Sequence, residues 1–237
     1  MPNGNEVCVV GITETGETIR PVCENGFLKS YLYSNNKLAV YPRSTVEWDF
    51  TQNTPIPPHI EDKMFKPDSI RFCGQCNDEQ WEQTLSKVSF KSVIDIFQGY
   101  LRYKKWVAPG APTRSIATLV NPLINSIEIV NTASVKSRLI FQDTSGNSYS
   151  LPINDLAFRE LSYKSIRRNN EKPEDVANSI SEKIRQSKKN YLRIGLARPW
   201  KNDPTEEERC YPQITGIYTF PDYLDGKNFS AFTATLR

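Results

Sequence analysis

The chain has 237 residues, of which 38% are hydrophobic and 11% aromatic, and this ordinary globular composition excludes disordered and fibrous proteins. A net charge of +3 at pH 7 is mildly basic and neither requires nor excludes a nucleic-acid partner. No apolar run reaches the roughly 18 residues that span a bilayer, and the first residues show no secretory signal, so we expect a cytoplasmic protein without membrane contact.

The first half begins with a predicted β-hairpin. Residues 6–12 and 18–22 are β-branched runs on either side of a Gly-containing turn. A further strand is predicted at residues 44–50, where Val46, Trp48 and Phe50 alternate with polar neighbours. The proline-rich loop that follows suits neither a helix nor a central strand.

The clearest helical pattern of the first half lies in residues 89–105. Apolar side chains fall on one helical face, with Ser89 as the predicted N-cap: Phe90, Val93, Ile94, Phe97 and Leu101. The Pro- and Gly-rich residues 108–112 end this helix and predict a domain boundary near residue 115.

The second half of the chain shows clearer patterns of strands and helix than the first. Three strands are predicted at residues 125–130, 135–143 and 148–153, and two more at 190–197 and 210–220. Between them a helix is predicted near residues 173–188, because Val176, Ile180 and Ile184 repeat every four residues. Acidic residues begin this helix and basic residues end it, an order that complements the helix dipole.

Three strands, a helix and two strands is the element order of an OB-fold, a small Greek-key barrel. The first half has the same ingredients with fewer clear strands. The predicted fold class is therefore α+β, mainly β with a few helices, with an OB-like Greek-key barrel in the second half and a similar set of elements in the first. We assign residues 1–115, with the 89–105 helix, to the first barrel, and residues 116–237, with a C-terminal extension, to the second.

Several stretches resemble the bacterial dual OB-containing domain family. CVVGITETGETIRPV is similar to the family's opening, VEWDF to its third strand and SFKSVIDIF to its helix. SRLIFQDTSGNSYSLPINDLAFRE resembles the second-barrel hairpin, and NYLRIGLARPW with CYPQITGIYTF resembles the closing strand pair. The segment PWKNDPTEEER and the tail PDYLDGKNFSAF look additional. The resemblance implies two OB-like Greek-key barrels packed as one unit, and a binding function follows only from what OB-folds do in general.

The stretch GYLRYKKW, residues 99–106, has two interpretations. As the end of a helix, its cations would interact favourably with the helix C-terminus and with solvent. As a binding surface, its aromatic rings would stack on nucleic-acid bases while its cations contact phosphates. The second interpretation makes these residues, with a nearby arginine, candidate nucleic-acid contacts: Tyr100, Arg102, Tyr103, Lys104, Lys105, Trp106 and Arg114.

Two further candidate contacts, Tyr191 and Arg193, lie on the predicted strand 190–197. Ligands of OB-folds usually cross the sheet face and its loops, so residues on this strand are better placed for base contact than cations at a helix end. Either side chain could equally face the core.

Cys73 and Cys76 have the C-x-x-C spacing that lets two thiolates reach one zinc ion. Because no second C-x-x-C exists, a zinc site would need Cys8, Cys23, Cys210 or His59 as further ligands. Unligated thiols and redox chemistry are the alternatives. We therefore expect no cofactor, with zinc at Cys73 and Cys76 as the hypothesis to test.

The sequence favours a binding protein over an enzyme. Its one histidine lies in a proline-rich loop, and no Gly-rich phosphate loop is present. A metal-dependent nuclease built on Glu47 and Asp49 is the least favoured class. The favoured function is non-catalytic binding of single-stranded DNA or RNA, and the alternative is a protein-interaction or scaffold subunit of a larger bacterial complex such as a defence system.

Overall fold

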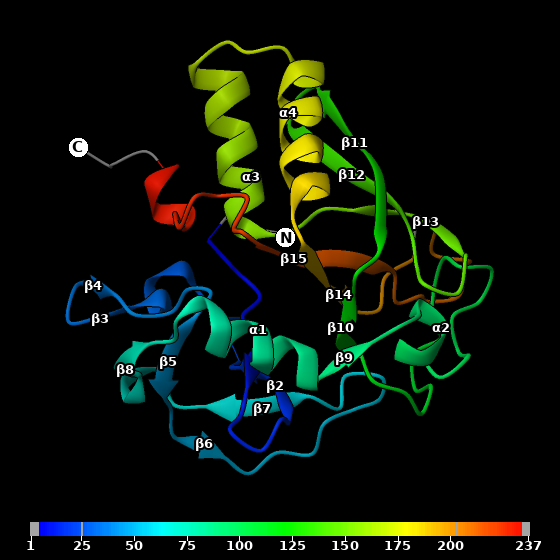
Figure 1. The fold of residues 1–237 in the computed structure, drawn as a ribbon. Helices are drawn as coiled ribbons and strands as arrows, with labels where there is room; N and C mark the ends of the chain where they lie inside the picture. The colour runs from blue at the N-terminus through cyan, green and yellow to red at the C-terminus, as the bar shows by residue number, and fades with distance from the viewer. Residues whose placement is uncertain (1–4, 25, 202, 234–237) are drawn as a thin grey trace.

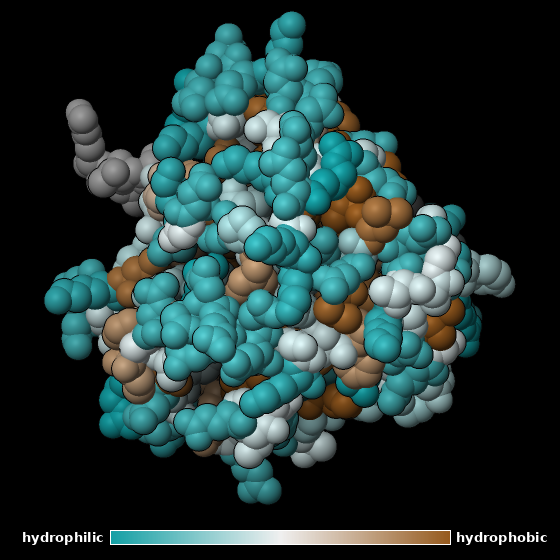
Figure 2. Space-filling model, in the orientation of Figure 1, coloured by the Kyte–Doolittle hydropathy of each residue, from teal (hydrophilic) through white to brown (hydrophobic). Residues whose placement is uncertain are grey.

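The computed structural model describes residues 5–24, 26–201 and 203–233. The fold is mainly β, and the helices α3 and α4 stand side by side at one end of the molecule (Figure 1). On the face shown in Figure 2, hydrophilic residues cover that helical end, and hydrophobic residues form small separate patches. Within the described residues, no helix is both long and apolar enough to cross a membrane.

The first half contains short strands. They are β1 (Gly11–Ile12), β2 (Thr18–Val22), β3 (Tyr33–Ser34), β4 (Lys37–Leu38), β5 (Ser44–Glu47), β6 (Phe50–Thr51), β7 (Asp62–Phe65), β8 (Arg71–Gln75) and β9 (Ser89–Phe90). Its helical segments are η1 (Lys29–Leu32), η2 (Pro67–Ser69), α1 (Asp78–Lys87) and α2 (Val93–Ile96).

The second half has longer elements. Its strands are β10 (Ile116–Val120), β11 (Leu123–Asn131), β12 (Val135–Gln142), β13 (Ser148–Pro152), β14 (Lys189–Leu196) and β15 (Pro212–Phe220). Its helical segments are α3 (Leu156–Tyr163), the π-helical turn η3 (Lys164–Arg168), α4 (Pro173–Gln186) and η4 (Phe229–Ala231).

The strands of the second half close into a barrel. β10 and β11 are separated only by Asn121 and Pro122 and together form one bent strand. Its β10 part belongs to the sheet of β14 and β15, and its β11 part belongs to the sheet of β12 and β13. β11 pairs with β12 and β12 with β13, while β10 pairs with β14 and β14 with β15. A parallel bridge between Ile153 and Ile214 joins the last two edges. The order β10/β11, β12, β13, β15, β14 around the barrel is that of an OB-fold.

Helix α4 covers one end of this barrel. Pro173 takes the first helical position, and Glu174 and Asp175 lie in the first turn, where carboxylates complement the helix dipole. The buried face of α4 packs against β11, and the backbone N–H of Ile127 donates to the Ser181 hydroxyl at 3.1 Å. The helix spans residues 173–186, where the sequence predicts 173–188.

The first half folds around aromatic side chains. Phe27 stacks on Phe65 with ring centroids 5.1 Å apart, and Trp48 packs against both rings. The predicted hairpin is confirmed, since β1 pairs antiparallel with β2. β2 also pairs in parallel with β7, so that the sheet order is β1-β2-β7-β6. The predicted strand at residues 44–50 is interrupted, because β5 pairs with β8 whereas β6 pairs with β7.

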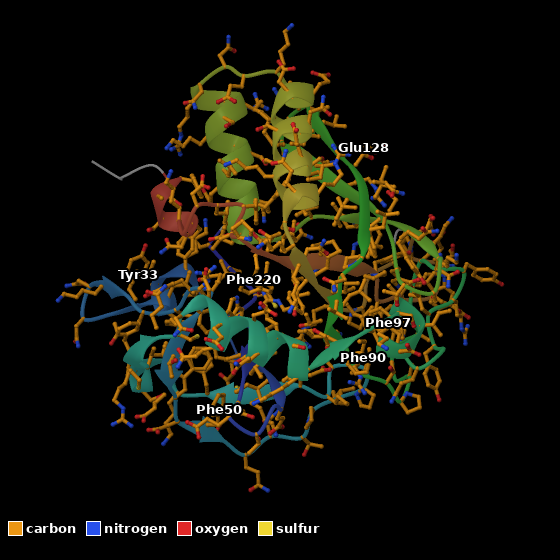
Figure 3. The ribbon with its side chains drawn as sticks, in the orientation of Figure 1. Tyr33, Phe50, Phe90, Phe97, Glu128 and Phe220 are labelled. Atoms are coloured by element: carbon orange, nitrogen blue, oxygen red, sulfur yellow. The ribbon has the colours of Figure 1, made fainter. Side chains whose placement is uncertain are left out.

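The two halves share one hydrophobic core. β9 pairs in parallel with β10, and Val107 forms an antiparallel bridge with Cys210. Figure 3 places Phe90 and Phe97 close together near β9 and α2, and Phe220 near the centre of the molecule. Residues after β9 therefore pack on the second barrel, although they precede the predicted boundary near residue 115.

The predicted helix at residues 89–105 is wrong in its extent. Ser92, not Ser89, caps the helix by accepting from the Asp95 backbone N–H at 3.1 Å. Helix α2 ends at Ile96, because Gln98 and Gly99 take left-handed backbone conformations with φ of 52° and 79°. The apolar spacing was misleading since Phe90 lies on a strand and Ile94 is exposed.

Candidate functional site

A groove of about 570 Å³ runs along β13, which is the edge strand of the β11-β12-β13 sheet. Several distant parts of the chain line it. They are the turn residues Tyr103, Lys104 and Lys105, then Arg138 on β12, strand β13 itself, and Tyr211 just before β15. Aromatic and cationic side chains thus come together from distant positions. Within the described part of the chain, no acidic residue lines the groove.

The GYLRYKKW stretch forms a tight turn and not a helix end. Arg102 and Trp106 pair antiparallel, with the Arg102 N–H donating to the Trp106 carbonyl at 2.8 Å. Between them Tyr103 and Lys104 have positive φ of 52° and 57°, a conformation that costs a non-glycine residue roughly 1 kcal/mol or more. The turn holds Tyr103 in solvent with 84% of its surface exposed. Such strain at a presented aromatic is typical of binding sites.

The Tyr149 ring lies at the floor of the groove, and the buried Phe141 ring supports it from below. Tyr149 stacks on Phe141 with centroids 5.5 Å apart, and the Lys104 ammonium lies 5.5 Å from the Tyr149 centroid. Burial, reinforced by the Asp143 carboxylate, raises the pKa of Tyr149 to about 12. Tyr149 is therefore a neutral phenol at physiological pH, and its ring gives the floor an uncharged surface.

Arg138 provides the cation of the opposite wall. It projects from β12, and its Nε donates to the Ser150 hydroxyl at 3.0 Å while Nη2 donates to the Ser150 carbonyl. These bonds hold the guanidinium across the edge of β13. With Lys104 and Lys105 it gives the groove a positive potential, the arrangement that attracts phosphate groups.

Trp106 secures the turn. It is only 9% exposed, and the guanidinium carbons of Arg102 and Arg209 each lie 5.0 Å from its ring centroid. The ring is therefore almost completely buried beside two cations and cannot stack on a base. Its role is to fix the turn against the segment that leads into β15.

The structure places the remaining predicted contacts outside the groove. Tyr100 is partly exposed, and the Arg114 guanidinium lies 4.4 Å from the Phe90 ring centroid. Tyr191 is 1% exposed in a cluster with Leu85, so its prediction as a base contact is corrected: it faces the core.

Arg193 is also a structural residue. Its Nε and Nη2 donate to the hydroxyl and carbonyl of Thr215 at 3.1 and 2.7 Å, and Nη1 reaches the Val10 carbonyl at 3.5 Å. Through these bonds the guanidinium of Arg193 on β14 connects β15 with the N-terminal segment. The choice of Tyr191 and Arg193 failed because the first half of the chain covers this face of β14. Tyr191 packs with Leu85 of α1, whereas Leu192 and Ile194 face the barrel interior.

Sequence reasoning missed Arg138, Tyr149 and Tyr211. Arg138 lies among exposed side chains that alternate with buried ones along β12, a pattern present in the sequence. Nothing in the sequence showed that the 102–106 turn would face this strand, since that contact depends on how the barrel closes.

The zinc hypothesis at Cys73 and Cys76 lacks further ligands. Among the residues that the structure describes, no group of three or more His, Cys, Asp or Glu side chains is placed to hold a metal ion. The Cys76 thiol donates to the Arg43 carbonyl at 3.0 Å, and burial raises the pKa of this thiol. A raised pKa disfavours the thiolate that zinc needs.

Two buried carboxylates, Glu61 and Asp62, hold the two halves of the chain together. Asp62 accepts from Arg20 Nε at 2.6 Å and pairs with Arg198 at 2.7 Å, joining β2 of the first half to the β14–β15 connection. The Glu61 carboxylate accepts from the backbone N–H groups of Ser115 and Ile116 at 2.9 and 3.2 Å. Both carboxylates therefore join the two halves. Glu47 is exposed and paired with Arg71.

His59, beside this cluster, predicts how stability depends on pH. Desolvation, with smaller contributions from Arg20 and Arg198, lowers its pKa from 6.5 to about 3. Between these values the unfolded chain binds the proton and the folded chain does not, so lowering the pH favours unfolding. We expect the free energy of unfolding to fall from pH 7 to about 5, a range in which carboxylates titrate little.

Urea denaturation at several pH values checks this expectation. In His59→Leu the decline between pH 7 and about 5 should flatten, because the titrating group is gone. A variant that keeps the full decline would contradict the assignment to His59.

The barrel order and the helix between its third and fourth strands define an OB-type protein. The sequence matches the family model described as the dual OB-containing domain over residues 2–217, and the chain belongs to this family. The predicted resemblance and the predicted fold class are thereby confirmed. Residues 218–237 lie outside the match. No curated protein and no solved structure matches the sequence.

Proposed function

We propose that this protein is a non-catalytic module that binds single-stranded DNA or RNA in the groove along β13. The observation that carries the proposal is the lining of that groove, where Tyr103 and Tyr211 lie beside Lys104, Lys105 and Arg138. Aromatic faces stack on bases of any sequence, and cations follow the phosphate backbone. No base-specific readout is required.

The position of the groove supports the proposal. OB-folds generally bind oligonucleotides on the face of their second and third strands and on the loop between the fourth and fifth. Arg138 lies on β12, the second strand of this barrel, and β13 is the third. Tyr211 ends the β14–β15 connection, which is the loop between the fourth and fifth strands.

Fluorescence anisotropy with labelled single-stranded DNA, single-stranded RNA and duplex DNA tests the proposal. If each of the three groove cations contacts one phosphate, the logarithm of affinity should fall with the logarithm of salt concentration with a slope of about −2. Failure to bind any single strand at low salt would refute the proposal.

Removing two groove cations should weaken this binding. Each exposed ionic contact is worth about 0.2–1 kcal/mol, so Lys104→Gln with Lys105→Gln should lower affinity by roughly two- to thirty-fold at low salt. The salt slope should become shallower by about 1.4. The matched control removes the exposed cations Lys37 and Lys172, which lie on β4 and just before α4. Equal losses in both double variants would show that net charge, and not the groove, is responsible.

A protein-interaction or scaffold role is the second candidate. Tyr41, which precedes β5, stacks on Phe72 of β8 with centroids 6.3 Å apart, and Phe72 is exposed. Exposed aromatic pairs are typical of protein interfaces. Salt separates the two functions, because phosphate binding weakens steeply as salt rises and an apolar interface does not.

A further inference from the structure

Trp200 is an exposed tryptophan that the proposed groove does not use. It is 55% exposed at the start of the β14–β15 connection. An antiparallel bridge to Arg209 holds its backbone, with N–H to carbonyl distances of 3.1 and 2.9 Å. Large exposed aromatic side chains on a fixed backbone are characteristic of binding surfaces.

The Trp200 ring continues the aromatic lining of the groove. Its centroid lies 6.2 Å from that of Tyr211, with the two planes at 63°, and Tyr211 itself lines the groove. Arg209, the backbone partner of Trp200, packs on Trp106 and so ties this segment to the 102–106 turn. Trp200 is therefore held beside the groove by the same contacts that build its wall.

The charged residues that follow Trp200 in the chain determine which part of a nucleic acid can bind beside its ring. Lys201, directly after Trp200, is exposed and donates to the Pro204 carbonyl at 3.2 Å, and the other charged residues before Arg209 are acidic: Asp203, Glu206, Glu207 and Glu208. The excess of acidic residues repels phosphate groups, whereas an uncharged base with a π-face is not repelled. Phosphates are thus favoured at Lys104, Lys105 and Arg138, and stacking of a base is the favoured contact at Trp200.

We infer that Trp200 stacks on a base of the same single strand that occupies the groove, which adds a nucleotide position beyond Tyr211. This inference rests on the proposed function. It assigns a contact to the PWKNDP segment that the groove alone leaves without a role. The inference also distinguishes base stacking from phosphate binding, because stacking at Trp200 adds affinity without adding a phosphate contact.

Trp200→Ala tests the inference by anisotropy with labelled oligothymidylate and oligouridylate of about twelve nucleotides, within the range that one OB-fold covers. Loss of one stacked base should weaken binding roughly five- to 150-fold. The salt slope should stay unchanged, whereas the Lys104→Gln, Lys105→Gln variant makes it shallower. Tyr33→Ala, which removes an exposed aromatic residue from β3, on the side of the molecule opposite β13 (Figures 1 and 3), should bind like the parent protein.

Tryptophan fluorescence gives a second readout. Trp200 is the most exposed tryptophan, since Trp48 and Trp81 are half-buried and Trp106 is buried. The exposed Trp200 should emit at the long-wavelength edge of the tryptophan spectrum, and a stacked base should quench that emission. The Trp200→Phe variant should keep the fold and lose most of the quenching. Parent-like affinity and quenching in the Trp200 variants would overturn this inference and leave the groove intact. Absence of single-strand binding by the parent protein would instead overturn the proposed function, and this inference with it.

Discussion

Replacing Asp62 with alanine is expected to lower the free energy of unfolding by about 3–5 kcal/mol, because it leaves a buried arginine without its counter-charge. Arg20 and Asp62 are both buried, and Arg20 Nη2 lies 2.5 Å from the Asp62 carboxylate. The same carboxylate pairs with Arg198, so one substitution removes both ion pairs. Urea denaturation with an unchanged m-value would measure the loss.

An exposed ion pair provides the control for Asp62. Glu47 and Arg71 pair at 2.9 Å on neighbouring strands, but both side chains are exposed. Glu47→Ala should therefore change stability by less than about 1 kcal/mol. A second variant separates charge from packing, because replacing Arg20 and Asp62 together by Met and Leu should recover much of the loss. Equal effects of Asp62→Ala and Glu47→Ala would show that burial does not strengthen the Asp62 contacts.

Trp106→Ala is expected to cost about 3–5 kcal/mol, the usual range for removing a buried tryptophan. Its ring packs against Arg102 and Arg209, and the adjacent Val107 pairs with Cys210. The substitution should also weaken single-strand binding, because it loosens the turn that carries the groove lysines. Thermal unfolding and anisotropy on the same variant would measure both losses.

Tyr103→Ala separates the effect on stability from the effect on single-strand binding. Tyr103 is highly exposed, so its removal should leave stability within about 0.5 kcal/mol of the parent protein. Loss of its stacking should still weaken binding roughly five- to 150-fold. If Trp106→Ala were as stable as Tyr103→Ala, the tryptophan would not fix the turn.

The sequence predicted much of the second barrel because its patterns are local. The alternation in β11, β12 and β13 and the four-residue repeat of Val176, Ile180 and Ile184 each identify an element without knowledge of its neighbours. The same reasoning failed at residues 89–105. There, strand pairing of Phe90 with β10 and the left-handed Gln98 override a helical spacing of apolar residues.

The candidate site was only partly predictable. Tyr103, Lys104 and Lys105 stand out as a run of aromatic and basic residues, and they do line the groove. Their partners Arg138 and Tyr211 are isolated in sequence and become neighbours only when the barrel closes. The assignment of Trp106 to base contact failed for a related reason, because nothing near it in sequence indicates that Arg209 would cover its ring.

The groove joins walls that are made at very different times during synthesis of the chain. The 102–106 turn leaves the ribosome well before Tyr211, but Trp106 packs on Arg209 and Val107 pairs with Cys210, so the basic wall is fixed only after the β14–β15 connection has been made. A chain divided near residue 115 would separate Tyr103, Lys104 and Lys105 from β12, β13 and Tyr211. Neither fragment would carry a complete groove, so binding measured on the two fragments separately would understate what the undivided chain binds.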